Sequence, residues 1–254
     1  MRARSTTLVV ALSVVAAGAC GSDSQPSAPS APTATGGAAT VRALVLTATA
    51  GFRHDSIPAA ITALRSTASS SNLSFTFTED LSTLSTDTLA RFDVVVFALT
   101  SGELPLTAAS KAALLDFVSA GHGFVGVHSA SDTLYEWPDY GRLVGAYFLE
   151  HPWTQRATVV VDDRTHPSMS GIDDRFFLFE EFYTFRDNPR GRVQVLLRLD
   201  AASVGSTGDY PLAWAQPFGS GRAYYNALGH FAETWNDTGF RRQMAGAIRW
   251  AAGR

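Results

Sequence analysis

The chain lacks several features on which familiar enzyme classes depend. Cys20 is its only cysteine, so no disulfide can form within the chain and thiol chemistry has no second candidate. No His-Glu-x-x-His motif indicates a zinc protease, no Gly-x-Gly-x-x-Gly motif follows the first predicted strand, and no Gly-x-Ser-x-Gly motif indicates a serine hydrolase. A net charge of −3 and the lack of any basic run argue against a nucleic-acid partner.

The first 40 residues do not resemble a folded domain. Residues 1–20 combine a basic start, a short apolar stretch and the sequence Ala17-Gly18-Ala19-Cys20, which predicts a lipoprotein-type signal peptide and lipidation of Cys20. Ordinary cleavage after Ala19 is the alternative. Residues 21–40 are rich in Ser, Pro and Ala and predict a flexible tether. We therefore expect an exported protein, held to a membrane of the cell envelope by its lipid.

Residues 41–254 are long enough for one α/β domain. Apolar strand patterns alternate with helical patterns through the first half, which predicts a mainly parallel sheet with helices on both faces. Short apolar segments in the second half predict antiparallel strands added at the sheet edge. The predicted strands cover residues 41–47, 73–78, 94–99, 124–127, 157–161, 176–182, 193–199, 212–216 and 222–227, and the predicted helices follow Ser56, cover 107–120 and cover 240–252.

Three histidines follow predicted strands. His54 comes after the first strand, His128 after the fourth and His230 after the last. Loops after parallel strands open on one edge of a sheet, so we expect His54 and His128 to lie together. His230 joins them if the last strand is parallel as well. A histidine can act as an acid, a base or a metal ligand near neutral pH, which makes this edge the predicted site.

The polar turn that His128 begins is the place where a glutaminase-type domain carries its cysteine. Here the turn offers His128, Ser129 and Ser131 instead, so we predict no glutaminase activity. Two other histidines have weaker claims to a site. His122 precedes its strand and belongs to the opposite edge, and we expect His166 to be solvated in a polar loop.

Other polar and aromatic residues are candidates for substrate contacts. Glu180 and Glu181 interrupt an apolar strand, and because neighbouring side chains on a strand face opposite sides, we expect Glu181 to point into the site and Glu180 into water. Trp137, in a predicted loop, could stack on a sugar ring or simply cover the sheet edge. The remaining candidates are Arg53, Asp132, His151 in a predicted loop, and Tyr183.

The order of these motifs resembles that of the ThuA-like family, over residues 42–253. The matching segments are 51–56 (Gly-Phe-Arg-His-Asp-Ser), 123–128 (Gly-Phe-Val-Gly-Val-His), 132–133, 137–138, 141–148, 151–152, 181–183 (Glu-Phe-Tyr), 219–222 and 228–230 (Leu-Gly-His). The resemblance implies a flavodoxin-like, class I glutamine amidotransferase-like fold. It also implies a role in disaccharide or keto-sugar metabolism.

These observations lead to one main functional hypothesis, an exported enzyme that acts on a small carbohydrate by acid–base chemistry. Two alternatives stay open, a non-catalytic sugar-binding protein and a hydrolase that uses a divalent metal. Apart from that possible divalent metal, no cofactor is predicted. The catalytic candidates are His54, His128, Glu181 and His230, and the substrate-binding candidates are Arg53, Asp132, Trp137, His151 and Tyr183.

Overall fold

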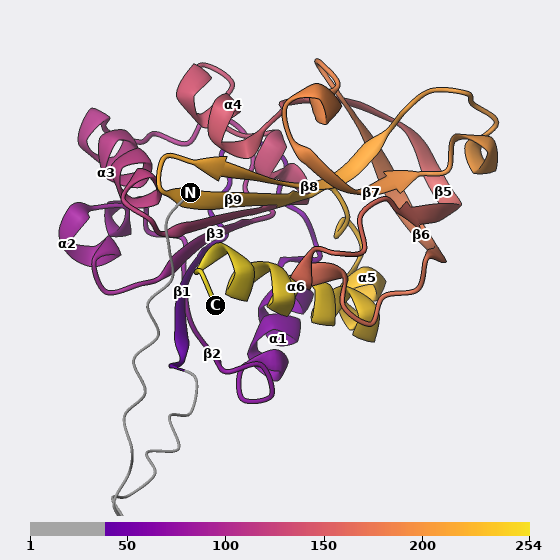
Figure 1. Cartoon of the computed structure of the whole chain (residues 1–254). Helices are drawn as coiled ribbons and strands as arrows, with labels where there is room; N and C mark the ends of the chain where they lie inside the picture. The colour runs from indigo at the N-terminus through magenta and orange to yellow at the C-terminus, as the bar shows by residue number, and fades with distance from the viewer. Residues whose placement is uncertain (1–38) are drawn as a thin grey trace, which may run out of the picture. The chain divides into compact units, whose positions relative to one another are not determined.

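The computed structural model describes residues 39–254, and these residues form a single nine-stranded sheet with helices packed on it (Figure 1). The predicted signal peptide, Cys20 and all but the last two residues of the predicted tether lie outside the described residues. Within residues 39–254, no helix combines the length and the apolar character needed to cross a bilayer.

The sheet is parallel in its first half and antiparallel in its second. Its strand order is β2-β1-β3-β4-β9-β8-β7-β5-β6, with β2, β1, β3, β4 and β9 parallel and each later neighbour antiparallel. The predicted mixed α/β fold is therefore confirmed. The strands are β1 (Val41–Leu46), β2 (Leu73–Thr78), β3 (Val94–Ala98), β4 (Gly123–Val127), β5 (Phe148–Val161), β6 (Arg175–Phe185), β7 (Gln194–Leu199), β8 (Pro211–Phe218) and β9 (Gly221–Asn226).

Helices cover both faces of the sheet, as Figure 1 shows. The helices α1, α5 and α6 pack together on one face, and α3 and α4 lie on the other with α2 beside α3. The bounds are α1 (Ile57–Thr67), α2 (Thr86–Leu89), α3 (Ala108–Ser119), α4 (Pro138–Val144), α5 (Ala232–Asn236) and α6 (Thr238–Ala251). The short helices α2, α4 and α5 were not predicted from the sequence, because none is long enough to show a helical period.

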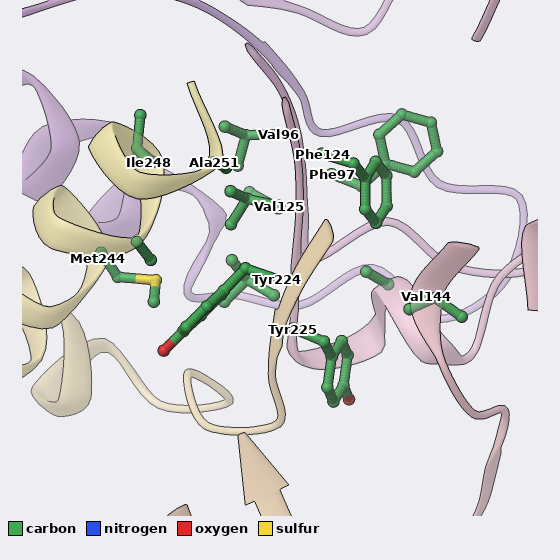
Figure 2. Packing of buried hydrophobic residues seen from close by; sticks show 14 of the residues in the cluster. Val96, Phe97, Phe124, Val125, Val144, Tyr224, Tyr225, Met244, Ile248 and Ala251 are labelled. Atoms are coloured by element: carbon green, nitrogen blue, oxygen red, sulfur yellow. The ribbon is translucent and has the colours of Figure 1, made fainter. Parts of the chain in front are cut away.

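The core consists of two apolar layers, one on each face of the central strands. Side chains alternate between faces along a strand, and Figure 2 shows the result. Val125 and Tyr224 point toward Ile248 of α6, while Phe124 and Tyr225 point to the opposite face. All five side chains are buried. This rigid double layer fixes the ends of β4 and β9 and hence the loops that follow them.

The long ribbon of β5 and β6 differs from the sequence prediction. β5 pairs with β7 only through Val159–Val161, but it pairs with β6 along nearly its whole length. The sequence predicted only the second part of β5, because two register shifts near Glu150 and Pro152 interrupt its alternation. His151 therefore lies on a strand and not in a loop. The free part of this ribbon brings residues of β6 to the end of the parallel sheet.

Candidate functional site

Three histidine rings meet at the carboxyl edge of the parallel sheet. His54 follows β1, His128 follows β4, and His230 follows β9, which runs parallel to β4. The centroid of the His54 ring lies 4.8 Å from that of His128 and 5.0 Å from that of His230. Nε2 of His128 is 3.2 Å from Nδ1 of His230. The structure thus brings together side chains from the beginning, the middle and the end of the domain.

His128 is held in a strained and fully buried position. Its φ is 53°, a left-handed conformation that costs a side-chain-bearing residue about 1 to 2 kcal/mol. Its Nδ1 lies 2.7 Å from the carbonyl oxygen of Ala227, and since a carbonyl only accepts, this nitrogen carries the proton. The lone pair of Nε2 therefore faces the other histidines. The hydroxyl group of Tyr183 donates to Nε2 over 2.9 Å.

Glu181 connects the cluster to a further histidine. Its Oε2 lies 3.0 Å from Nδ1 of His230 and 3.7 Å from Nε2 of His128. Its Oε1 lies 3.3 Å from Nδ1 of His151, whose side chain is about half exposed (47 %). Side-chain ligand atoms of His54, His128, Glu181 and His230 all lie within 4.8 Å of one another, so a single metal ion could contact all four.

Glu180 is buried and does not face water, contrary to the sequence-based expectation. Its carboxylate accepts hydrogen bonds from the backbone N–H groups of Gly229 (2.9 Å), His230 (3.1 Å) and Glu181 (3.0 Å) and from the Thr234 hydroxyl (2.8 Å). The two glutamates therefore lie on opposite faces of β6. Glu181 contacts the histidine cluster, whereas Glu180 binds the loop that carries His230. The only sequence signal for Glu180 was a charge in an apolar strand.

Burial sets the ionisation of the cluster. Burial, followed by the charge of His230, lowers the pKa of His54 to about 4. Burial, followed by the charge of His54, lowers the pKa of His128 well below its usual range. Burial alone would raise the pKa of Glu181, but its hydrogen bond with His230 keeps the pKa below the usual value. At neutral pH the imidazoles of His54 and His128 are therefore neutral, and the carboxylate of Glu181 is ionised.

Aromatic rings surround the open side of the cluster. Phe52, 65 % exposed, packs edge-on against His54 with 4.8 Å between centroids. Phe231 packs against His230 at 4.5 Å, and Phe148 stacks near His151 at 6.0 Å. Such rings can bury the apolar face of a sugar while polar groups read its hydroxyls. The sequence pattern suggested Trp137 for this role, but the rings beside these histidines are phenylalanines.

Three of the residues proposed as substrate contacts are engaged elsewhere. The guanidinium of exposed Arg53 forms an ion pair with Glu79. Trp137 is buried against Tyr140, so its ring covers the sheet edge and offers no open face to a sugar. Asp132 is half-buried and accepts a hydrogen bond from the hydroxyl of Tyr135. By contrast, His151 and Tyr183 contact the cluster, His151 through Glu181 and Tyr183 through His128.

The last two histidines lie apart from the cluster. His122 stacks on Phe117 of α3, with 4.2 Å between ring centroids, at the opposite edge of the sheet as predicted. His166 was expected in solvent, but it is buried beside Trp250, and its Nδ1 accepts a hydrogen bond from the backbone N–H of Ser168. The short helical turn after His166 packs on α6, which explains why a polar loop became buried.

A separate groove of about 520 Å³ lies between β6 and the helices α5 and α6. Phe177, Phe179, Arg156 and Arg242 line it, and none of the four cluster residues does. The groove has no histidine, so its lining lacks the groups that make the histidine cluster the candidate site.

Comparison with known protein families gives a match over most of the described residues. The sequence profile of ThuA, described as trehalose utilisation, matches residues 42–251. The chain belongs to the ThuA family. No curated protein matches the chain.

Solved structures of similar fold include two ThuA-like proteins. One, from Bacteroides uniformis, has a TM-score of 0.72 and 23% identity, covering 86% of this chain and 94% of its own. Another, from Parabacteroides merdae, has a TM-score of 0.68 and 18% identity, covering 84% and 90%. A GMP synthase component from Thermoplasma acidophilum has a TM-score of 0.53 and 11% identity, covering 84% and 95%. These likenesses show the fold, which is that of ThuA-like and glutamine amidotransferase-like proteins.

Proposed function

We propose that this ThuA-family protein is an enzyme that acts on a small carbohydrate, a disaccharide or a keto-sugar, at the histidine cluster. The observation that carries the proposal is the meeting of His54, His128, His230 and Glu181 at the carboxyl edge of the sheet, the usual location of a ligand in this class of fold. The family description, trehalose utilisation, supports a carbohydrate as substrate. The exposed ring of Phe52 beside His54 supports sugar binding at the same place.

The chemistry that this arrangement favours is proton transfer. Glu181 holds His230 through one carboxylate oxygen and His151 through the other, and both rings are partly open to solvent. A carboxylate that orients an imidazole makes it an effective general acid or base, worth about 10² to 10⁴ in rate. Glutaminase chemistry is not part of the proposal, because His128 stands where a thiol nucleophile would be needed and Cys20 is the only cysteine.

A substrate screen with matched variants tests this proposal. We expect turnover of at least one disaccharide or keto-sugar, a loss of kcat/KM of about 100-fold or more in His230→Ala, and little change in His122→Ala, whose ring lies at the opposite edge. Binding measured by calorimetry without turnover would identify a sugar-binding protein instead. A protein that neither binds nor converts any sugar in the panel would refute the proposal.

We also propose that the protein is exported and anchored through a lipid on Cys20. The basic start, the apolar stretch and the Ala-Gly-Ala-Cys sequence support this location. The wild-type protein should fractionate with membranes and carry a lipid on its amino terminus, and Cys20→Ser should release it into the soluble fraction. A soluble wild-type protein with an unmodified amino terminus would contradict the proposal.

A further inference from the structure

We propose that His54, His128, His230 and Glu181 bind one divalent transition-metal ion of the zinc type. This inference rests on the proposed function, because it names the ion that the same cluster would hold during the reaction.

The spacing of the ligand atoms is the first argument. Metal–ligand bonds of about 2.0 to 2.1 Å place the ligands of a tetrahedral site about 3.3 Å apart. The separations here are 3.2 Å between His128 Nε2 and His230 Nδ1, 3.0 Å between His230 Nδ1 and Glu181 Oε2, and 3.7 Å between His128 Nε2 and Glu181 Oε2. A ring nitrogen of His54 completes a set within 4.8 Å. One ion can therefore contact His128, His230 and Glu181 at these separations, and a small shift of the His54 side chain would bring its ring nitrogen to the same ion.

The hydrogen bonding of His128 is the second argument. Its Nδ1 donates to the carbonyl oxygen of Ala227, which fixes the tautomer and leaves Nε2 unprotonated. Imidazole ligands of metals commonly have this arrangement, with the outer nitrogen bound to a carbonyl or a carboxylate. The Nε2 lone pair accepts from the Tyr183 hydroxyl in this structure and would have to exchange that hydrogen bond for the metal, but it also lies 3.7 Å from the Glu181 carboxylate, and two acceptors gain from a cation between them.

The balance of charge is the third argument. Glu180 and Glu181 are both buried, and neither forms an ion pair with a lysine or arginine within residues 39–254. Two buried carboxylates cost several kcal/mol unless a positive charge compensates them. A divalent cation at the cluster would balance the charges of these two carboxylates, of which only Glu181 is a ligand candidate. Mixed imidazole and carboxylate ligands favour zinc or another transition metal over magnesium or calcium, which prefer all-oxygen ligands.

With four protein ligands, a substrate oxygen would have to join the ion as a fifth ligand, an expansion that zinc permits, and it could enter only from the less buried side of the site. His54 and His128 are buried, whereas the His230 side chain is 20 % exposed and His151 lies outside the ligand set at the open end. The oxygen atoms of a sugar would approach the ion from the side of His230 and His151, the less buried histidines. If His230 is a metal ligand, His151, which contacts Glu181 Oε1, would be the residue that transfers a proton to or from the substrate.

Metal titration of the full chain, purified with a tag that contains no histidine, tests the inference. After treatment with a chelator, we expect the protein to take up about one equivalent of Zn²⁺ or Co²⁺ per chain, measured by elemental analysis, and Co²⁺ to give a visible absorption band. His128→Ala and His230→Ala should each weaken this binding by more than about 100-fold, since loss of an outer partner alone costs 10- to 100-fold. His122→Ala should bind as the wild type does.

His230→Ala keeps the test decisive if His128→Ala does not fold, because the His230 ring is partly exposed at the rim. No stoichiometric uptake of Zn²⁺, Co²⁺, Ni²⁺ or Mn²⁺ by folded wild-type protein would overturn the inference, and so would uptake that His230→Ala leaves unchanged. Sugar turnover by the metal-free protein would overturn the metal site and leave the proposed function intact. A bound metal without turnover of any sugar would support the metal site and contradict the proposed enzymatic function.

Discussion

The buried carboxylate of Glu180 accepts a hydrogen bond from the backbone N–H of His230, 3.1 Å away, although 50 residues separate them in the chain. The same carboxylate binds Gly229 and Thr234 on either side. Ser56 adds a second link, because its hydroxyl donates to the carbonyl oxygen of Gly229 (3.1 Å) and makes no capping hydrogen bond at the start of α1. The backbone that presents His230 is therefore fixed from β6 and from the loop of His54.

Glu180→Gln should destabilise the protein without removing any group of the cluster. The amide retains one acceptor oxygen but turns an NH2 group toward N–H donors, so at least one buried donor loses its partner. We expect the free energy of unfolding to fall by about 2 to 4 kcal/mol, measured by urea denaturation. Glu79→Gln, which breaks an exposed ion pair with Arg53, should cost about 0 to 1 kcal/mol. Equal effects of the two substitutions would contradict this role for Glu180.

Phe52→Ala should weaken sugar binding with little effect on stability. Phe52 is 65 % exposed and touches His54 at the rim of the site, so its loss leaves no cavity. Aromatic contacts contribute about 0.5 to 1.5 kcal/mol, which corresponds to roughly a 2- to 12-fold increase in Kd. Phe177→Ala is the matched control, because Phe177 is equally exposed (69 %) but lines the separate groove. Similar Kd values for the wild type and Phe52→Ala would show that the ring does not contact the substrate.

Gly145→Ala should destabilise the fold at the end of α4. Gly145 has a φ of 96°, and a Cβ there would lie 2.4 Å from Nε1 of the fully buried Trp214. That indole N–H donates to the carbonyl oxygen of Val144, so the ring cannot turn away without losing its partner. We expect a loss of about 3 kcal/mol or more from strain and overpacking together, read from thermal and urea unfolding. Gly191→Ala, with no atom within 4 Å, should change stability by less than about 1 kcal/mol.

His166 should make the protein sensitive to acid. Burial lowers the pKa of His166 to about 4, whereas the unfolded chain has the ordinary value near 6.5. The unfolded state then binds more protons between these values, so stability is complete above about pH 6.5 and falls as the pH drops toward 4, by at most about 1.4 kcal/mol per pH unit. His166→Asn keeps an acceptor for the Ser168 N–H but does not titrate. Its unfolding free energy should depend less steeply on pH in this window, and an unchanged slope would assign the effect to other groups.

Much of the fold followed from local patterns in the sequence. Continuous apolar runs marked β3 and β4, the helical period marked α3 and α6, and Thr107 and Gly121 marked the two ends of α3. The position of the candidate site also followed from the sequence. His54 and His128 come after parallel strands, and the loops after parallel strands open on one edge of a sheet.

Other features depended on contacts between distant segments, which no local pattern encodes. The direction of β9 was open in the sequence, and its pairing with β4 is what brings His230 to the cluster. The free part of the β5–β6 ribbon decides that Glu181 reaches His128 and that Glu180 is buried. The sequence by itself determined most of the strands, the three longest helices and the edge that carries the histidines. Only the tertiary structure decided which side chains meet there, because long-range strand pairing and burial select among faces and directions that are locally equivalent.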